Sequence, residues 1–127
     1  MNISQAAKNA GLPVKTVRYY ADIDLVAPSG RTESGYRDFD ERSVKMLTFV
    51  KRSRDFGFSI EECRELLDLY QNQDRSSADV KRLASLRLEQ IRAKQIELQQ
   101  LHDELAHLVS SCRGDDRPHC PILNHLG

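Results

Sequence analysis

The chain has 127 residues, of which 39% are hydrophobic, 30% charged and only 6% aromatic. This length allows one or two small domains, and no run approaches the roughly 20 apolar residues of a membrane span. The formal net charge is zero, but residues 1–58 hold 10 Lys and Arg against 7 Asp and Glu, a net +3, whereas residues 59–127 hold 9 against 12, a net −3. The basic bias of the N-terminal half fits a nucleic-acid contact there.

The N-terminus lacks the basic and apolar segments of a secretory signal. We therefore expect a cytoplasmic protein whose three cysteines are free or metal-binding thiols rather than disulfides. No enzyme activity is expected, because the chain has no Gly-rich phosphate loop and no convincing pair of nucleophile and base.

The first predicted element is a helix over residues 3–10, with Ser4 as its N-cap. Gly11 supplies a turn, and Pro13 opens a second helix that runs to Tyr20. Helical spacing turns three side chains of the second helix inward: Val14, Val17 and Tyr20. Two short helices joined by a glycine turn are typical of a helix-turn-helix. The pattern alone is equally compatible with a pair of surface helices.

Residues 28–39 predict a hairpin, or wing, framed by Gly30 and Gly35. Tyr36 and Phe39 are expected to anchor it to the helices. Two arginines, Arg31 and Arg37, flank its tip, where a guanidinium group can reach phosphate oxygens.

Two further helices follow the wing. Asp40 is the predicted N-cap of a helix over residues 41–55, and Gly57 lies just beyond its end. Residues 59–62 form a capping box that opens a helix to about Tyr70. Cys63 within this helix is interpreted as a small buried hydrophobic residue.

After a polar break at residues 71–76, a helix is predicted from Ser77 to about Val109, because this stretch has neither Gly nor Pro. Apolar residues recur in heptads along it, at Ala84, Ile91, Leu98 and Leu105, with Leu88, Leu101 and Leu108 beside them. A long amphipathic helix cannot bury such a stripe alone, so pairing with another chain is expected.

Cys112 and Cys120 then bracket a loop that contains Gly114, Asp115 and Pro118, which no helix accommodates. Thiols at the two ends of a short loop indicate a soft-metal clamp or a redox pair. Soft thiolates favour Cu(I), Ag(I) and Au(I), which accept two ligands, whereas structural zinc takes four ligands from Cys and His. Nearby histidines at 107, 119 and 125 keep a zinc interpretation open.

Three stretches resemble MerR-type transcription regulators: residues 11–20 (GLPVKTVRYY), residues 31–37 (RTESGYR) and residues 56–62 (FGFSIEE). The likeness extends over essentially the whole chain. It implies a mainly α fold, with a winged helix-turn-helix domain over residues 1–70 whose helix-turn-helix covers about residues 4–23. A long antiparallel coiled-coil dimerisation helix over residues 77–110 follows, and then a short C-terminal metal-binding loop and terminal helix over residues 111–127. Asp24 departs from the family, whose members usually carry Gly there.

The resemblance also implies a homodimer that binds double-stranded promoter DNA and acts with RNA polymerase, bending and untwisting the promoter when metal is bound. Six residues match positions where the family contacts DNA: Lys15, Arg18, Tyr20, Arg31, Tyr36 and Arg37. Within the family, residues 76–81 and the two cysteines are similar to the copper(I)-responsive CueR branch. Cys112 and Cys120 would then bind Cu(I), Ag(I) or Au(I), and Ser77 would mark selectivity for monovalent ions. The open alternatives are a disulfide-based redox sensor, a divalent-metal sensor, and a coiled-coil adaptor or metal chaperone.

Overall fold

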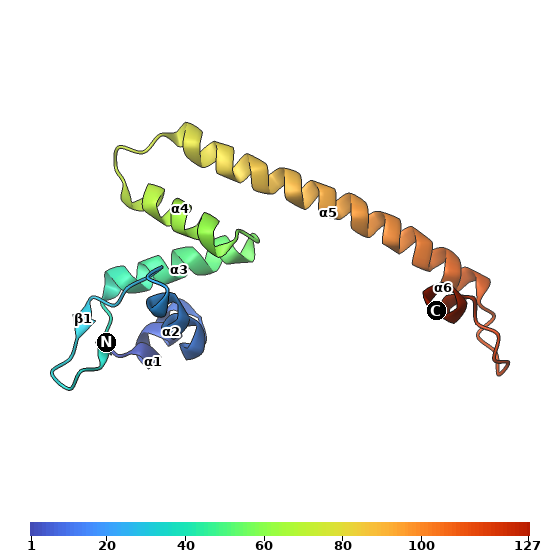
Figure 1. Cartoon of the computed structure of the whole chain (residues 1–127), viewed down its shortest axis with the longest axis horizontal. Coiled ribbons are helices and arrows are strands. Elements are labelled where there is room, and N and C mark those ends of the chain that lie inside the picture. Colours follow the sequence, from blue (N-terminus) through green and yellow to red (C-terminus); the bar gives the residue numbers. More distant parts are fainter. The chain divides into compact units, whose positions relative to one another are not determined.

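The computed structural model describes residues Met1 to Gly127 and forms two compact units, Met1–Leu83 and Ala84–Gly127. The first unit contains four helices, a two-stranded hairpin and the first turns of a long helix, and the second contains the remainder of that helix and a short terminal helix (Figure 1). In chain order the elements are α1 Ile3–Ala10, α2 Val14–Asp22, β1 Gly30–Arg31, β2 Arg37–Asp38, α3 Glu41–Asp55, α4 Ile60–Gln71, α5 Ser77–Ser111 and α6 Pro121–Leu126.

The predicted mainly α fold is confirmed, with two short N-terminal helices, a hairpin and a long C-terminal helix. No helix combines the length and the apolar character that crossing a bilayer requires. The predicted domain boundaries at residues 70, 77 and 110 divide the chain by function and stay predictions. The two compact units of the structure are a different division. They meet after Leu83, which is buried in the core of the first unit.

The start of α1 differs from the prediction. Asn2, not Ser4, is the N-cap: its side chain accepts a hydrogen bond from the Gln5 N–H at 2.9 Å, and the Gln5 side-chain Oε1 accepts one from the Asn2 N–H at 3.0 Å. The extended backbone of Asn2 brings its short side chain onto the free N–H groups of the first turn, which a residue already inside the helix cannot do. Pro13 likewise precedes α2 as its N-cap instead of forming its first residue.

The core of the first unit lies between α1, α2, α3 and α4. α1 packs against α2 and α3, and α3 packs against α4. The largest fully buried side chains are Phe39, Leu47, Val17, Val26, Val50 and Cys63. The inward orientation of Val17 and Tyr20 and the burial of Cys63 are confirmed, and burial raises the pKa of the Cys63 thiol.

The predicted wing is present. β1 and β2 pair antiparallel, with Gly30 opposite Asp38 and Arg31 opposite Arg37. Gly35 turns the chain at φ +84°, a left-handed conformation that suits glycine. Phe39 anchors the wing in the core as predicted, but Tyr36 is 73% exposed, so the second anchor was wrong. Tyr36 lies beside the turn of the wing, where it lines an open cleft together with Arg18 of α2 instead of entering the core.

The caps of α3 and α4 are confirmed. The Asp40 carboxylate accepts hydrogen bonds from the Ser43 N–H and hydroxyl at 2.8 and 3.0 Å, and these bonds lower the pKa of Asp40. Ser59 and Glu62 form the reciprocal capping box at 3.1 and 2.9 Å. Between the two helices, Gly57 adopts φ +87° immediately after the C-cap of α3.

Asp24 follows α2 with φ +58°, in the left-handed region where most non-glycine residues are strained. The chain thus makes at Asp24 a turn of the kind that glycine usually occupies. Asp is among the few residues that adopt this conformation readily.

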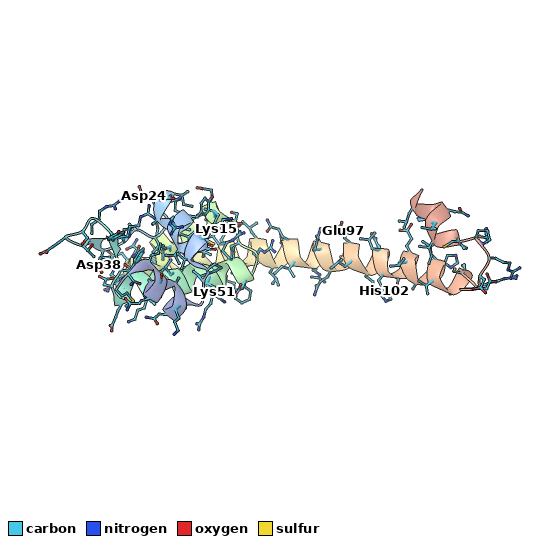
Figure 2. The ribbon with its side chains drawn as sticks, turned by 90° about the horizontal axis from the view of Figure 1, so that it is seen from below. Lys15, Asp24, Asp38, Lys51, Glu97 and His102 are labelled. Atoms are coloured by element: carbon cyan, nitrogen blue, oxygen red, sulfur yellow. The ribbon has the colours of Figure 1, made fainter.

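In the second unit, α5 projects side chains all around its length (Figure 2). Four residues of the predicted heptad stripe, Leu88, Leu98, Leu101 and Leu105, are between 53% and 66% exposed, so this chain by itself leaves the stripe without a partner. α6 folds against α5 over a groove of about 390 Å³ lined by Leu101, Glu104, Leu105, Leu108, His125 and Leu126. His125 contacts the Glu104 carboxylate across this groove.

Candidate functional site

A basic cleft in the first unit joins α1, α2 and the wing. It has a volume of about 350 Å³ and is lined by Asn2, Ile3, Arg18, Arg31, Gly35, Tyr36 and Arg37. Four of the six predicted DNA-contacting residues therefore meet around one cavity, although they come from two stretches of the chain. Three guanidinium groups around an open cleft provide the donors that phosphate oxygens require.

Two of these arginines are already oriented by the protein. Arg31 Nη1 donates to the Gly35 carbonyl at 2.8 Å, which ties its side chain to the wing turn. Arg37 is paired with the Asp22 carboxylate at the end of α2, so the base of the wing is linked to that helix. Sequence reasoning did not single out Asp22. Asp22 precedes Arg37 by 15 residues, so no short sequence motif indicates that the two side chains pair.

Lys15 and Tyr20 lie outside the lining of the cleft. Lys15 is exposed near the start of α2, and Figure 2 shows it within the same N-terminal unit as Asp24, which follows α2. Tyr20 is only 6% exposed, and burial raises its pKa against the opposing effect of Arg54. The ring of Tyr20 thus belongs to the core. The neighbouring Tyr19, which is 51% exposed, is the tyrosine of α2 that faces solvent.

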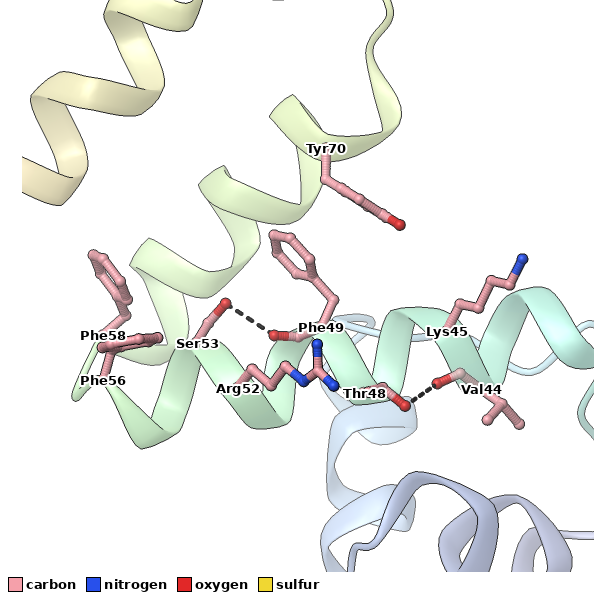
Figure 3. A pocket seen from close by; sticks show the side chains of 9 residues that line it. All are labelled: Val44, Lys45, Thr48, Phe49, Arg52, Ser53, Phe56, Phe58 and Tyr70. Atoms are coloured by element: carbon pink, nitrogen blue, oxygen red, sulfur yellow. Dashed lines mark hydrogen bonds between the residues drawn. The ribbon is translucent and has the colours of Figure 1, made fainter.

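A second cavity, of about 610 Å³, lies along α3 and reaches the first residues after it and Tyr70 of α4. Its lining residues are Val44, Lys45, Thr48, Phe49, Arg52, Ser53, Phe56, Phe58 and Tyr70 (Figure 3). The Phe49 and Tyr70 rings stack at a centroid distance of 4.5 Å. The Thr48 and Ser53 hydroxyls donate to carbonyls of their own helix at 2.9 Å, which leaves an apolar groove with Lys45 and Arg52 on it.

In the second unit the two cysteines flank the loop between α5 and α6. The Cys112 N–H donates to the Leu108 carbonyl at 3.1 Å and closes the last turn of α5. Cys120 is the N-cap of α6, and Pro121 occupies the first turn of that helix. Gly114, at φ +66°, and the Asp115–Arg117 ion pair, at 2.7 Å, shape the loop between them.

The two thiols are adjacent. Backbone N–H groups lower the pKa of the Cys120 thiol, Leu123 most strongly and Ile122 after it, and a hydrogen bond with the Cys112 side chain adds to the effect. The Cys120 side chain does not cap α6 with a hydrogen bond. The thiolate is instead favoured by the N–H groups at the start of α6 that lie near its sulfur. Both cysteines are free and half-buried.

No third side chain completes a larger ligand set. The structure contains no group of three or more His, Cys, Asp or Glu side chains placed to hold a metal ion. His125 contacts Glu104 instead of the thiols, and Cys63 is fully buried in the first unit. Ser77 is the first residue of α5 and is exposed. The donors on this chain therefore suit an ion that accepts two soft ligands.

Comparison with known proteins adds the family context. The model of the MerR HTH family regulatory protein matches residues 1–70, and the model described as MerR, DNA binding, matches residues 44–108. The chain is 52% identical to the HTH-type transcriptional regulator HmrR of Rhizobium leguminosarum bv. viciae, over 99% of this chain and 97% of the relative. It is 41% identical to the HTH-type transcriptional regulator CueR of Salmonella typhimurium, over 99% and 91%. The transcription regulator PbrR691 of Ralstonia metallidurans CH34, solved in complex with lead(II), superposes with a TM-score of 0.83 at 33% identity, over 100% and 99%.

Proposed function

Because the chain belongs to the MerR family of transcription regulators, we propose that it is a metal-responsive activator whose effector is Cu(I), held by Cys112 and Cys120. The observation that carries this proposal is the pair of interacting thiols, Cys112 at the end of α5 and Cys120 at the start of α6, without a third ligand. Ag(I) and Au(I) share the preference for two soft ligands and are expected to bind the same pair. The regulated genes would then serve copper efflux or detoxification.

The donor set argues against a divalent effector. Structural zinc takes four ligands from Cys and His, and a thiol pair supplies only half of them. Two thiolates around a monovalent cation carry a net charge of −1, which is costly in a site that excludes water. The Leu123 and Ile122 N–H groups beside Cys120 offset that charge. We propose that Ser77 marks the same selectivity from the second copy of the chain, because an antiparallel pair of α5 helices would bring the start of one α5 beside the end of the other, where a Cys would add a third soft ligand.

DNA binding is assigned to α2 and the wing. Lys15 and Arg18 on α2 would meet the duplex, and Arg31, Tyr36 and Arg37 would meet it from the wing side of the basic cleft. Tyr20 would support α2 through its packing in the core, since its ring is buried. A homodimer with two such clefts fits a promoter with two related half-sites.

The dimer would be held by α5. Its apolar stripe is exposed along four heptads in the single chain, and an antiparallel coiled coil with a second copy buries it. The groove along α3 is a second apolar surface of the chain that lacks a cover, and we assign it to the same partner copy.

Activation requires distortion of the promoter. Bending or untwisting a site of this size costs on the order of 1–6 kcal/mol. That free energy must come from a difference in effector affinity between the two conformations of the protein. Cys112 closes α5 and Cys120 opens α6, so bridging their sulfurs would fix α6 against α5. In this mechanism the ordered loop favours the dimer that presents the promoter to RNA polymerase.

The test is transcription in vitro from a responsive promoter, with and without Cu(I), for wild type, Cys112→Ser and Cys63→Ala. Cys112→Ser is expected to abolish induction while operator affinity stays near wild type. Cys63→Ala also removes one thiol, but this thiol is buried in the first unit, so induction should persist. Induction by copper that survives in Cys112→Ser would contradict the proposal.

The adjacent thiols also favour a second candidate, a redox sensor that closes a Cys112–Cys120 disulfide. Mass spectrometry of metal-free protein exposed to peroxide, together with transcription from the same promoter, separates the two. A redox sensor would be induced by peroxide without copper, whereas a copper sensor would not.

A further inference from the structure

The C-terminal end of α2 is held by two arginines that come from other elements of the first unit. Arg37 of β2 pairs with Asp22, the last residue of α2. Arg64 of α4 donates from Nη1 to the Asp24 carbonyl and from Nη2 to the Ile23 carbonyl, each at 3.0 Å. Residues 22 to 24 are thus contacted by Arg37 of the wing and by Arg64 of α4.

The Arg64 contact has a defined geometry. A helix leaves its last carbonyls without N–H partners, and one planar guanidinium here satisfies two neighbouring carbonyls at once. The backbone at this point turns through the left-handed conformation of Asp24, and both carbonyls lie within hydrogen-bond distance of the guanidinium. The positive charge also lies at the negative end of α2, where it is favourable. The Arg64 side chain is 34% exposed, and its Nε lies 3.9 Å from Glu61.

This contact connects two helices that otherwise meet little along their backbones. α2 packs against α1, which packs against α3, and only α3 packs extensively against α4. The Arg64 fork is therefore the direct polar connection between the end of α2 and α4, across 40 residues of sequence. A small rotation of α2 would have to break at least one of its two hydrogen bonds.

We propose that Arg64 is a positioning residue for DNA recognition, which fixes the orientation of α2 and hence of Lys15 and Arg18 on the duplex. The proposal rests on the proposed function only in taking α2 as the DNA-reading helix. Arg64 itself does not contact DNA in this account. It acts through the backbone of residues 23 and 24.

The test compares wild type, Arg64→Met, Arg64→Lys and Glu61→Gln as full-length, metal-free protein. Arg64→Met keeps most of the aliphatic stem and removes both donors, Arg64→Lys keeps the charge without the fork, and Glu61→Gln removes the ion pair but leaves the fork. Binding is measured by fluorescence anisotropy over a salt series. The two probes are the duplex that the wild-type protein selects from a random pool and a scrambled duplex of the same composition.

Arg64→Met is expected to lose about tenfold in affinity for the selected duplex, because charge-assisted hydrogen bonds of this kind are among the stronger ones in proteins. Its affinity for the scrambled duplex and its salt slope should stay at wild-type values, since no phosphate contact is lost. The affinity of Arg64→Lys for the selected duplex should lie between those of wild type and Arg64→Met, and that of Glu61→Gln should equal the wild-type value.

Two results would overturn the proposal. Equal losses on both duplexes with a shallower salt slope would make Arg64 a phosphate contact. An unchanged preference for the selected duplex, together with a lower melting temperature, would make the fork a structural cap only. Copper is absent throughout, so a failure of the copper assignment leaves this test intact. A wild-type protein that selects no duplex would instead refute the assignment of α2 as the DNA-reading helix.

Discussion

At position 24, glycine should give a more stable protein than alanine. Inside a helix the order is the reverse, with alanine more stable than glycine. Asp24 has φ +58° and an exposed side chain, and its contact with Arg64 uses only its backbone carbonyl. Both substitutions therefore keep that hydrogen bond, and the comparison isolates the backbone conformation.

The expected magnitude follows from two opposing effects. A left-handed conformation costs an L-residue with a Cβ about 1–2 kcal/mol, and glycine avoids this cost. The freedom of glycine in the unfolded chain costs about 0.5–1 kcal/mol in return. Asp24→Gly should therefore be more stable than Asp24→Ala by about 0.5–1 kcal/mol, with the wild-type Asp between them or close to glycine.

Asp68 provides the matched control, because it is an exposed aspartate in the right-handed backbone of α4. There, Gly should be less stable than Ala by about 1 kcal/mol. The free energy of unfolding is measured by urea titration followed by circular dichroism, at one protein concentration, since the stability of a dimer depends on concentration. The same order of Gly and Ala at both positions would refute the left-handed conformation of residue 24.

Further predictions concern the thiol, the dimer, a cap and the DNA contact. In metal-free protein, alkylation of Cys120 by iodoacetamide should rise with pH to a midpoint below the ordinary thiol value, because its pKa is lowered; a midpoint at or above that value, by peptide mapping, would contradict the structure. The same shift makes the thiolate favour the folded state, so its contribution to stability should be complete above the unfolded pKa and be lost as pH falls through the folded pKa. Leu101→Glu should convert the dimer to a monomer in light scattering, whereas Gln100→Glu should not, and equal behaviour of the two would argue against the heptad seam. Ser59→Ala should lower the free energy of unfolding by about 1 kcal/mol, because the N-cap of α4 is lost, whereas Ser59→Asp should keep the cap and the stability. Arg18→Gln should reduce the salt slope of DNA binding by about 0.9 per phosphate, or about 2 for a dimer, and an unchanged slope would remove Arg18 from the DNA contacts.

The sequence predicted most of the local structure because local signals determine it. The capping box at Ser59, the Asp40 cap and the glycines at 11 and 57 each act within one turn of chain, and each is found where expected. The long helix followed from the lack of breakers between residues 77 and 109, and it extends to Ser111. Where two neighbouring residues competed for one role, as Asn2 and Ser4 did at the first cap, the local signal was too weak to choose.

The site was harder to predict, because its geometry depends on contacts between distant residues. Helical spacing indicated that Tyr20 faces inward, whereas resemblance placed it at DNA, and the structure buries its ring. Asp22 and Arg64 were missed, since each acts through a partner 15 or about 40 residues away. The thiol pair was the exception, because a short loop with its cysteines at both ends brings them together by itself.

The central claim is that Cys112 and Cys120 alone bind a monovalent ion. X-ray absorption at the copper edge, on the full-length dimer loaded with one equivalent of Cu(I) per chain under anaerobic conditions, tests it most directly. The proposal predicts a two-coordinate ion with only sulfur neighbours, and Cys63→Ala should give the same spectrum. Three or more ligands, or nitrogen in the first coordination sphere, would contradict it.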